Sequence, residues 1–442
     1  MRILRLAELS ANELSALKRR AEVDIEQALS VAGEAIAKIR QHGDEGVLEY
    51  ARKFDFPGAE TGNLKVTEAE FAFAREAIAP ELKAAIAHAC ANIREVHQRQ
   101  LPEEIQLGEI APGVFAGEKV SPIASAGLYV PRGKGAFPSV MLMLAVPAVV
   151  AGVKRIIVCT PPGKDGSVEP ASLVAAEMAG VSEIYKLGGI QAIAAMALGT
   201  ETVPKIDKIT GPCNVYGSAA KRLLYGTTNV GLPAGPSESI ILADETTDPR
   251  LAALDLLVEA EHGPDSAALL VTHSEAVGLK AAENASEYLK QLPEWRRQFC
   301  STGLSTHGGI LLTESLQQSI DFVNEYAPEH MEILTADPMS LLGAIQHAGE
   351  ILLGPYTPIP TANYCIGVNA ILPTGGFARS YSAVSVHEFL KRASLGYLTR
   401  EGFDRLKHTT QTLADYEGFP AHAMAIRERD AWLQTRDRAQ SK

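Results

Sequence analysis

The strongest constraint on the fold is a regular alternation of short apolar segments with helical segments between residues 125 and 353. The first series of strand-like segments covers residues 126–131, 155–159, 183–187 and 208–211. The second series covers residues 239–242, 267–271, 309–312, 331–334 and 350–353. A helical segment separates most neighbouring strands, and this alternation is typical of parallel βαβ units. We therefore predict an α/β protein with two open, mainly parallel, incomplete Rossmann-like domains and a cleft between them.

The flanking segments have a different character. Residues 11–55 and 68–100 carry apolar residues at helical spacing, and Thr67 with Glu70 forms a capping-box pattern before the second run. The segment from about residue 385 is polar, charged and helical. We divide the chain into an N-terminal helical extension (1–24), a first α/β domain (25–128 and 239–384), a second α/β domain (129–238) and a C-terminal helical arm (385–442).

Composition argues against several classes of protein. The formal net charge of −12 disfavours a nucleic-acid partner, for which a basic face is expected. The five cysteines are scattered without a CxxC pair, which suits a reducing cytoplasm better than a disulfide framework. The N-terminus lacks a long apolar stretch, and the apolar run 140–150 is too short to span a bilayer. We expect a cytoplasmic protein that acts on a small molecule and binds neither nucleic acid nor membrane.

The turn Tyr-Ala-Pro-Glu-His-Met at residues 326–331 is the leading candidate for catalytic chemistry. Pro328 is expected to end the preceding helix, because it lacks a backbone N–H and biases the residue before it away from helical angles. Glu329 and His330 would then stand where a turn enters a strand, with side chains able to face a cleft. Glutamate and histidine are the usual proton carriers near neutral pH, although an adjacent pair is also common on solvated surfaces.

Three glycine-containing turns at predicted strand ends are candidate phosphate sites: 133–138, 188–191 and 211–214. Such turns can bring backbone N–H groups and a helix N-terminus to a phosphate at one edge of a parallel sheet. None is a Walker loop or a complete GxGxxG motif, and each taken alone could be a tight turn without a ligand.

Two further patterns leave a choice open. Glu259 and His262 share one face of a predicted helix and could supply two zinc ligands, or could form a solvated face. Ser237 lies in the turn 235–238, where it could contact a ligand or cap the turn. The sequence has no GxSxG elbow and no recognisable catalytic cysteine motif.

Seven short segments, taken together, resemble the histidinol dehydrogenase family. They are Leu128-Tyr-Val-Pro131, Gly188-Gly-Ile-Gln-Ala-Ile-Ala194, Gly211-Pro-Cys-Asn214, Pro233-Ala-Gly-Pro-Ser-Glu238, Glu259-Ala-Glu-His-Gly-Pro-Asp265, Tyr326-Ala-Pro-Glu-His330 and Leu372-Pro-Thr374. They occur in the family's order and span nearly the whole chain. The resemblance implies an NAD-dependent enzyme that oxidises an amino alcohol through an aldehyde to a carboxylate in two hydride transfers. It also implies a homodimer in which the C-terminal arm completes the partner's site.

The resemblance further implies roles for single residues. His330 would handle the alcohol proton as the acid/base, and Glu329 would activate the water that attacks the aldehyde. The positions that match the family's NAD contacts are Tyr129, Gln191 and Asn214. The positions that match its substrate contacts are Ser237 and Glu417.

The expected metal site departs from the family pattern in two positions. The family's zinc ligands Gln, His, Asp and His correspond to Glu259, His262, Asn363 and His422. The exchange conserves charge, and two imidazoles, a carboxylate and an amide oxygen are all acceptable to zinc. We therefore expect a retained Zn²⁺ site. The alternative is a catalytically silent binding protein in which these residues are relics.

Departures near the expected substrate site concern specificity. A histidine used by the family corresponds to Ala370, and Arg379 introduces a nearby cation. Arginine can bind a carboxylate or sulfonate with two hydrogen bonds, although most arginines are simply exposed. These changes favour a divergent paralogue that oxidises an anionic diol such as sulfopropanediol, with a true histidinol dehydrogenase as the alternative.

Overall fold

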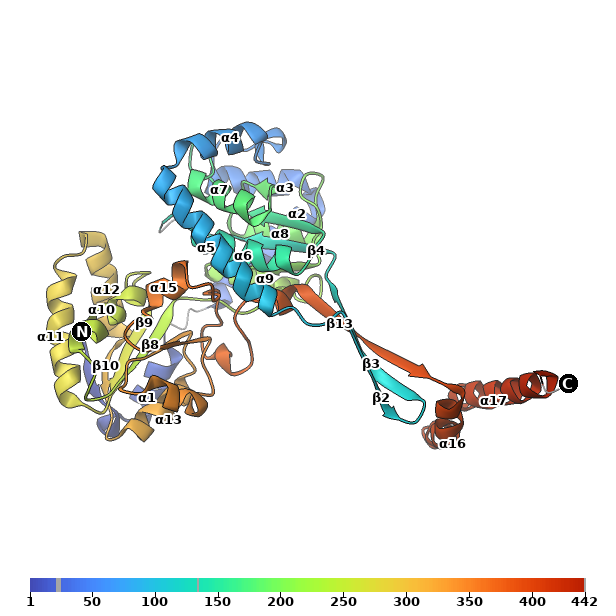
Figure 1. The fold of residues 1–442 in the computed structure, drawn as a ribbon. Helices are drawn as coiled ribbons and strands as arrows, with labels where there is room; N and C mark the ends of the chain where they lie inside the picture. The colour runs from blue at the N-terminus through green and yellow to red at the C-terminus, as the bar shows by residue number, and fades with distance from the viewer. Residues whose placement is uncertain (21–24, 133–134, 441–442) are drawn as a thin grey trace. The chain divides into compact units, whose positions relative to one another are not determined.

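The computed structural model describes residues 1–20, 25–132 and 135–440 (Figure 1). The chain forms two compact units. The larger unit comprises Met1–Leu101 and Pro122–Phe389, and the smaller one comprises Pro102–Ser121 and Leu390–Lys442. The larger unit contains two parallel sheets, which confirms the predicted α/β class. The boundary expected at residue 24 lies outside the described residues.

The first sheet has six parallel strands in the order β1-β10-β9-β8-β11-β12. The strands are β1 (Ile3–Arg5), β8 (Glu238–Ala243), β9 (Ala267–Thr272), β10 (Gly309–Leu312), β11 (His330–Ile333) and β12 (Glu350–Leu353). Alternate residues of a strand point to opposite faces, and helices cover both faces here (Figure 1). One face packs against α10 (Pro249–Ala260), α11 (Glu275–Leu289) and α12 (Glu294–Thr306). The other packs against α1 (Ala11–Arg19) and α13 (Leu316–Tyr326).

The second sheet has four parallel strands in the order β6-β5-β4-β7. They are β4 (Ser125–Tyr129), β5 (Arg155–Cys159), β6 (Ile184–Tyr185) and β7 (Lys208–Thr210). The helices that alternate with them are α6 (Pro138–Val150), α7 (Pro170–Ala179), α8 (Gly189–Leu198) and α9 (Val215–Leu224). The apolar run 140–150 lies in α6, a helix in which eight residues are buried.

Two segments pack elsewhere than expected. The helices of residues 25–99 are α2 (Ile25–His42), α3 (Asp44–Tyr50), α4 (Glu68–Ala77) and α5 (Pro80–Arg99). We placed this segment with the six-stranded sheet, but α2 shares an apolar core with α8 and α9, and α5 packs against α6 and α7. Helical spacing reveals that a helix has an apolar face, but not which sheet covers it. The expected N-terminal helical extension also contains strand β1, which pairs with β10.

The smaller unit combines a three-stranded sheet with two helices. Its strands β2 (Ile105–Ala111) and β3 (Val114–Pro122) form an antiparallel hairpin, and β13 (Leu390–Leu398) pairs with β3. Helices α16 (Arg400–Tyr416) and α17 (Pro420–Gln440) follow and confirm the helical part of the expected arm, whereas β13 is a strand that we did not predict. Short helices α14 (Pro338–Leu341) and α15 (Ile359–Tyr364) complete the described α-helices of the larger unit. None of the helices in the described ranges is long and apolar enough to cross a membrane.

Candidate active site

A sharp turn between α13 and β11 places the Glu329–His330 pair. Helix α13 ends at Tyr326, and Ala327 adopts a left-handed conformation with φ 54° and ψ 68°. Its N–H still donates to the carbonyl of Val323, so the turn closes the helix before Pro328. His330 is then the first residue of β11, a strand enclosed by β8 and β12. The prediction that the helix ends before Pro328 is confirmed, and left-handed Ala327 provides the turn.

The His330 imidazole is buried between three carboxyl groups. Its Nδ1 contacts the carboxylate of Glu350, which is its register partner on β12. Its Nε2 lies 3.8 Å from Oε1 of Glu329 and 3.9 Å from Oε1 of Glu259. The two ring nitrogens therefore have different surroundings, with one nitrogen held by a carboxylate and the other facing the two remaining acids.

These acids change the pKa values at the site. Burial opposes charge on His330, but Glu259, Glu350 and Glu329 outweigh it and raise its pKa to about 10. Burial also raises the pKa of Glu329, to about 8, despite the opposing effect of His330. The pKa of buried Glu259 nevertheless falls, to about 2, because His262 and His330 stabilise its charge. With no metal charge beside Glu259, these neighbours favour a proton on His330 and on Glu329 and a negative charge on Glu259.

A second layer supports Glu329. Its Oε2 accepts the backbone N–H of Glu238 at 2.8 Å. The Glu238 carboxylate lies 3.0 Å from Nε of Arg20 and accepts the N–H of Gly375 at 2.7 Å. Arg20 in turn stacks 3.7 Å from the centre of the Tyr326 ring. We did not predict Arg20, Glu238 or Glu350 as site residues. Glu238 closes one of the family-like segments, whereas the other two have no local signal and are placed by strand register and long-range packing.

Three of the four expected metal ligands converge. Oε2 of Glu259 lies 3.1 Å from Nδ1 of His262, and Oε1 accepts a hydrogen bond from the Asn363 amide at 3.2 Å. The Glu259 charge raises the pKa of His262 to about 9, so that a positive charge is already favoured beside this buried carboxylate. An imidazole, a carboxylate and an amide are ligand types that fit a zinc ion, and a turned Asn363 amide would present its oxygen where its N–H group now meets Glu259. No cluster of three or more His, Cys, Asp or Glu with metal-site geometry occurs in the described part of the chain. The expected fourth ligand, His422, lies on α17 of the smaller unit.

The residues expected to contact NAD, Tyr129, Gln191 and Asn214, lie at or just beyond the carboxyl ends of β4, β6 and β7. The Tyr129 hydroxyl accepts the N–H of Gly189 at the start of α8, at 2.9 Å. The Gln191 amide donates to Asp55 at 2.8 Å, and Asn214 caps α9 through its side chain. Two of the three glycine turns thus meet one sheet edge, because Gly211 lies directly against the Tyr129 backbone. Gly133 and Lys134 of the third turn lie outside the described residues.

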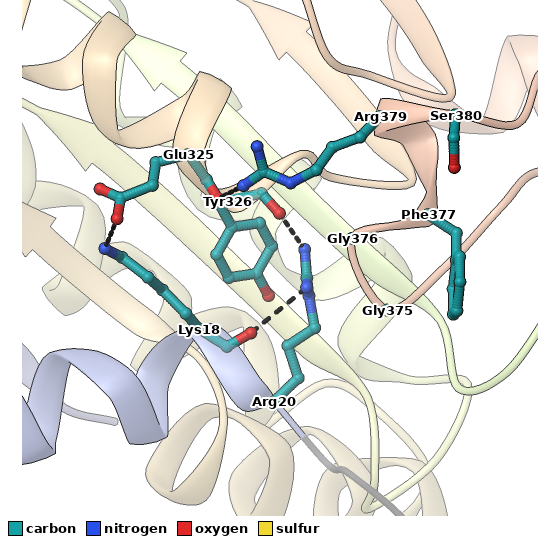
Figure 2. Close-up of a pocket in the computed structure, with 9 residues that line it drawn as sticks. All are labelled: Lys18, Arg20, Glu325, Tyr326, Gly375, Gly376, Phe377, Arg379 and Ser380. Atoms are coloured by element: carbon teal, nitrogen blue, oxygen red, sulfur yellow. Dashed lines mark hydrogen bonds and ion pairs between the residues drawn. The ribbon is translucent and has the colours of Figure 1, made fainter.

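The residues expected to contact substrate are divided between the two units. Ser237 immediately precedes β8, and Arg379 lines a pocket of about 520 Å³ with Lys18, Arg20 and Phe377 (Figure 2). Figure 2 shows the Arg379 guanidinium donating to the Glu325 carbonyl, while Lys18 pairs with the Glu325 carboxylate. Arg20 connects this pocket to Glu238, whose backbone holds Glu329. Glu417 is the C-terminal capping residue of α16, in the smaller unit.

Comparison with known proteins covers almost the whole chain. The family model for histidinol dehydrogenase matches residues 18–430. A histidinol dehydrogenase from a Synechocystis species is 65% identical over 98% of this chain and 100% of that protein. A histidinol dehydrogenase homolog from Cereibacter sphaeroides is 50% identical over 97% of this chain and 98% of that protein. The crystal structure of histidinol dehydrogenase from Elizabethkingia anophelis superposes with a TM-score of 0.93 at 34% identity, covering 98% of this chain and 99% of that chain. The chain therefore belongs to the histidinol dehydrogenase family, whose members are NAD-dependent dehydrogenases that oxidise an alcohol through an aldehyde to the acid.

Proposed function

We propose that this protein is a histidinol dehydrogenase. Its substrate would be L-histidinol, which loses two hydrides to two NAD molecules and gains a water oxygen to become L-histidine. The observation that carries the proposal is the full-length 65% identity to the Synechocystis histidinol dehydrogenase. That similarity favours histidinol over the anionic diol suggested by Ala370 and Arg379. The single free cysteines also agree with a cytoplasmic enzyme.

The buried acid–imidazole cluster can supply the proton chemistry of both steps. His330 would take the alcohol proton at Nε2 as the first hydride leaves. Glu329 would hold and deprotonate the water that adds to the aldehyde, and the second hydride would leave from the hydrated form. Tyr129, Gln191 and Asn214 would orient NAD at the sheet edge beside the N-termini of α8 and α9. Ser237 and Glu417 would orient the substrate.

The metal would be held by Glu259, His262 and Asn363, together with His422 as the resemblance implies. When bound, zinc would act as a Lewis acid towards the substrate and would offset the Glu259 charge that raises the pKa of His330.

Steady-state NADH formation tests the proposed substrate. With zinc and NAD present, L-histidinol should be oxidised with two NADH formed for each alcohol consumed, and His330→Asn should abolish this activity. Racemic sulfopropanediol serves as the competing substrate. A kcat/KM for sulfopropanediol about tenfold or more above that for histidinol would contradict the proposal, because it would represent over 1 kcal/mol of preferential transition-state binding.

One observation favours oxidation of an anionic diol as a second candidate. The pocket that contains Arg379 also contains Lys18 and Arg20, so three cationic side chains border it. If a sulfonate binds there, Arg379→Ala should raise KM for sulfopropanediol without changing turnover of histidinol. Arg155→Ala, which removes an exposed arginine paired with Glu183 in the other sheet, is the matched control. Unchanged kinetics with both substrates would exclude Arg379 from substrate binding.

The zinc content tests the exchanged ligand set. We expect about one zinc per chain, as in other single-site zinc enzymes. Glu259→Gln and Asn363→Asp each alter the ligand charge by one unit and should weaken zinc binding. The double variant restores both the family's residue types and the original charge, so it should bind zinc more tightly than either single variant. A wild-type protein that takes up no zinc when supplied with it would instead favour a silent binding protein.

A further inference from the structure

We propose that Glu350 is a positioning residue for the catalytic imidazole. Its carboxylate accepts the Nδ1–H of His330 and leaves Nε2 as the atom that takes the substrate's proton. This inference rests on the proposed role of His330, which comes from the histidinol dehydrogenase resemblance. Glu350 is not among the residues to which that resemblance assigns a role.

The contact is fixed by the backbone of two paired strands. His330 and Glu350 are register partners on β11 and β12, and the Glu350 N–H donates to the Glu329 carbonyl at 3.0 Å. Register partners in a parallel sheet present their side chains to the same face, side by side. Gly349 allows this close approach, since a Cβ there would lie 2.6 Å from the Glu329 carbonyl oxygen.

Among the residues that the structure describes, no other hydrogen bond competes for the Glu350 carboxylate. The Glu350 side chain is 6% exposed and that of His330 is 4% exposed. The second oxygen of Glu350 has no hydrogen-bond partner within the described ranges. The contact with His330 is therefore the main polar interaction of this carboxylate. Burying a carboxylate with one unsatisfied oxygen costs free energy of folding, and the hydrogen bond to the His330 ring offsets part of that cost.

The other acids around His330 cannot replace Glu350. Glu329 and Glu259 face Nε2 at 3.8 and 3.9 Å, beyond hydrogen-bond distance. Glu332 lies two residues along β11 on the same face, but it pairs with Asp255 on α10 and carries a raised pKa, so it is neutral near pH 7. The surroundings therefore select one tautomer, with the proton on Nδ1. A carboxylate behind an imidazole orients a general base and stabilises the imidazolium that it forms.

Kinetics of the two half-reactions test the inference. Glu350→Leu removes the acceptor, and Glu350→Gln keeps its shape but removes its charge. Both should lower kcat for the alcohol by about 100-fold or more, with KM values for alcohol and NAD little changed. Oxidation of the aldehyde should fall less, because Glu329 activates the water in that step. Glu332→Gln, which changes a buried carboxyl on the same face, is the matched control and should leave the ratio of the two rates unchanged.

Nitrogen-15 NMR of labelled histidine measures which ring nitrogen of His330 carries the proton. This property would not change if Glu350 only stabilised the fold. In the zinc-loaded wild-type protein, at a pH where the ring is neutral, the His330 signal, identified by its loss in His330→Asn, should report a proton on Nδ1. In folded Glu350→Gln or Glu350→Leu it should shift to the other tautomer or to a mixture. An unchanged tautomer and unchanged alcohol turnover in these variants, while His330→Asn is inactive, would overturn this inference alone. An active His330→Asn would overturn the proposed function of His330 as well.

Discussion

Ala327 forms the turn that positions Glu329 and His330, and its left-handed backbone conformation restricts which residues this position can accept. It has a φ of 54° and is fully buried between α13 and Pro328. Left-handed angles cost an L-residue roughly 1–2 kcal/mol and are worse for β-branched side chains. We expect Ala327→Gly to retain or raise the free energy of unfolding. Ala327→Val should lower it by about 2 kcal/mol or more, because strain and overpacking add.

Urea unfolding, together with NADH formation by the surviving folded protein, measures this effect. The valine variant should also lose activity beyond its loss of stability, since Glu329 and His330 follow the turn directly. Equal stabilities of the glycine and valine variants would show that the left-handed turn imposes no strain.

A buried acid pair behind the site predicts an unusual dependence of stability on pH. Asp255 and Glu332 are buried carboxyl groups that act on each other's pKa, and within the described residues neither oxygen of Glu332 has an N–H or cationic partner, so a proton on one of the two acids is favoured. Burial raises the pKa of both groups, and Asp255 raises that of Glu332 further. The unfolded chain releases both protons above about pH 4.5, whereas the folded chain retains one, so this pair favours the unfolded state increasingly as pH rises.

Replacing the protonated member should remove that pH dependence. Glu332→Gln keeps a hydrogen-bond donor for Asp255 and has no proton to lose. The free energy of unfolding of Glu332→Gln, relative to that of the wild type, should therefore rise by about 1 kcal/mol or more as the pH is raised from about 5 to about 9. Urea unfolding at several pH values measures the difference, and parallel curves for the two proteins would contradict the protonated pair.

At the scale of elements, a single glycine sets the spacing of β11 and β12. A Cβ at Gly349 would meet the Glu329 carbonyl oxygen at 2.6 Å, and this backbone atom cannot move without shifting β11. We expect Gly349→Ala to lower turnover by about tenfold or more by displacing Glu350 from His330, since ångström-scale errors of this kind are costly. Gly343→Ala adds the same methyl group at a position where no atom of the described residues lies within 4 Å, so it should be neutral. Similar kinetics of the two variants would show that this strand spacing does not matter.

Local patterns predicted many of the elements that are decided locally, although the hairpin of β2 and β3 was not predicted. The capping box at Thr67 starts α4 as expected, and β5, β9, β10 and β12 lie close to their predicted bounds. The three-residue strand β1 and the extended strand β13 escaped prediction, because both are defined by partners far away in the sequence. The same holds within the site. The turn bearing Glu329 and His330 was visible in the sequence, but Glu350 and Arg20 reach it only through register and long-range packing.

At the scale of the whole molecule, alternation of strands and helices predicted two parallel sheets but not how the remaining helices are distributed. Helices α2 to α5 have apolar faces that either sheet could cover, and the structure packs α2 and α5 beside the helices of the four-stranded sheet. The sequence likewise does not show which residues form one site. His330 lies in the larger unit, whereas His422 and Glu417 lie in the smaller one. An experiment can decide whether His422 and Glu417 act in the site of their own subunit or in that of a second copy of the chain.

We propose a homodimer in which the C-terminal arm of each subunit completes the site of the other, and mixed dimers test it. His330→Ala and His422→Ala should each be inactive as homodimers, because each lacks a residue of every site. Unfolding and refolding an equal mixture places the two variants in one dimer, where one of the two sites is intact if arms are exchanged. About a quarter of wild-type activity should then return, since half of the dimers are mixed. If each arm serves its own subunit, every site in the mixture carries one defect and no activity returns. A mixture of wild type and the double variant is the control for exchange itself.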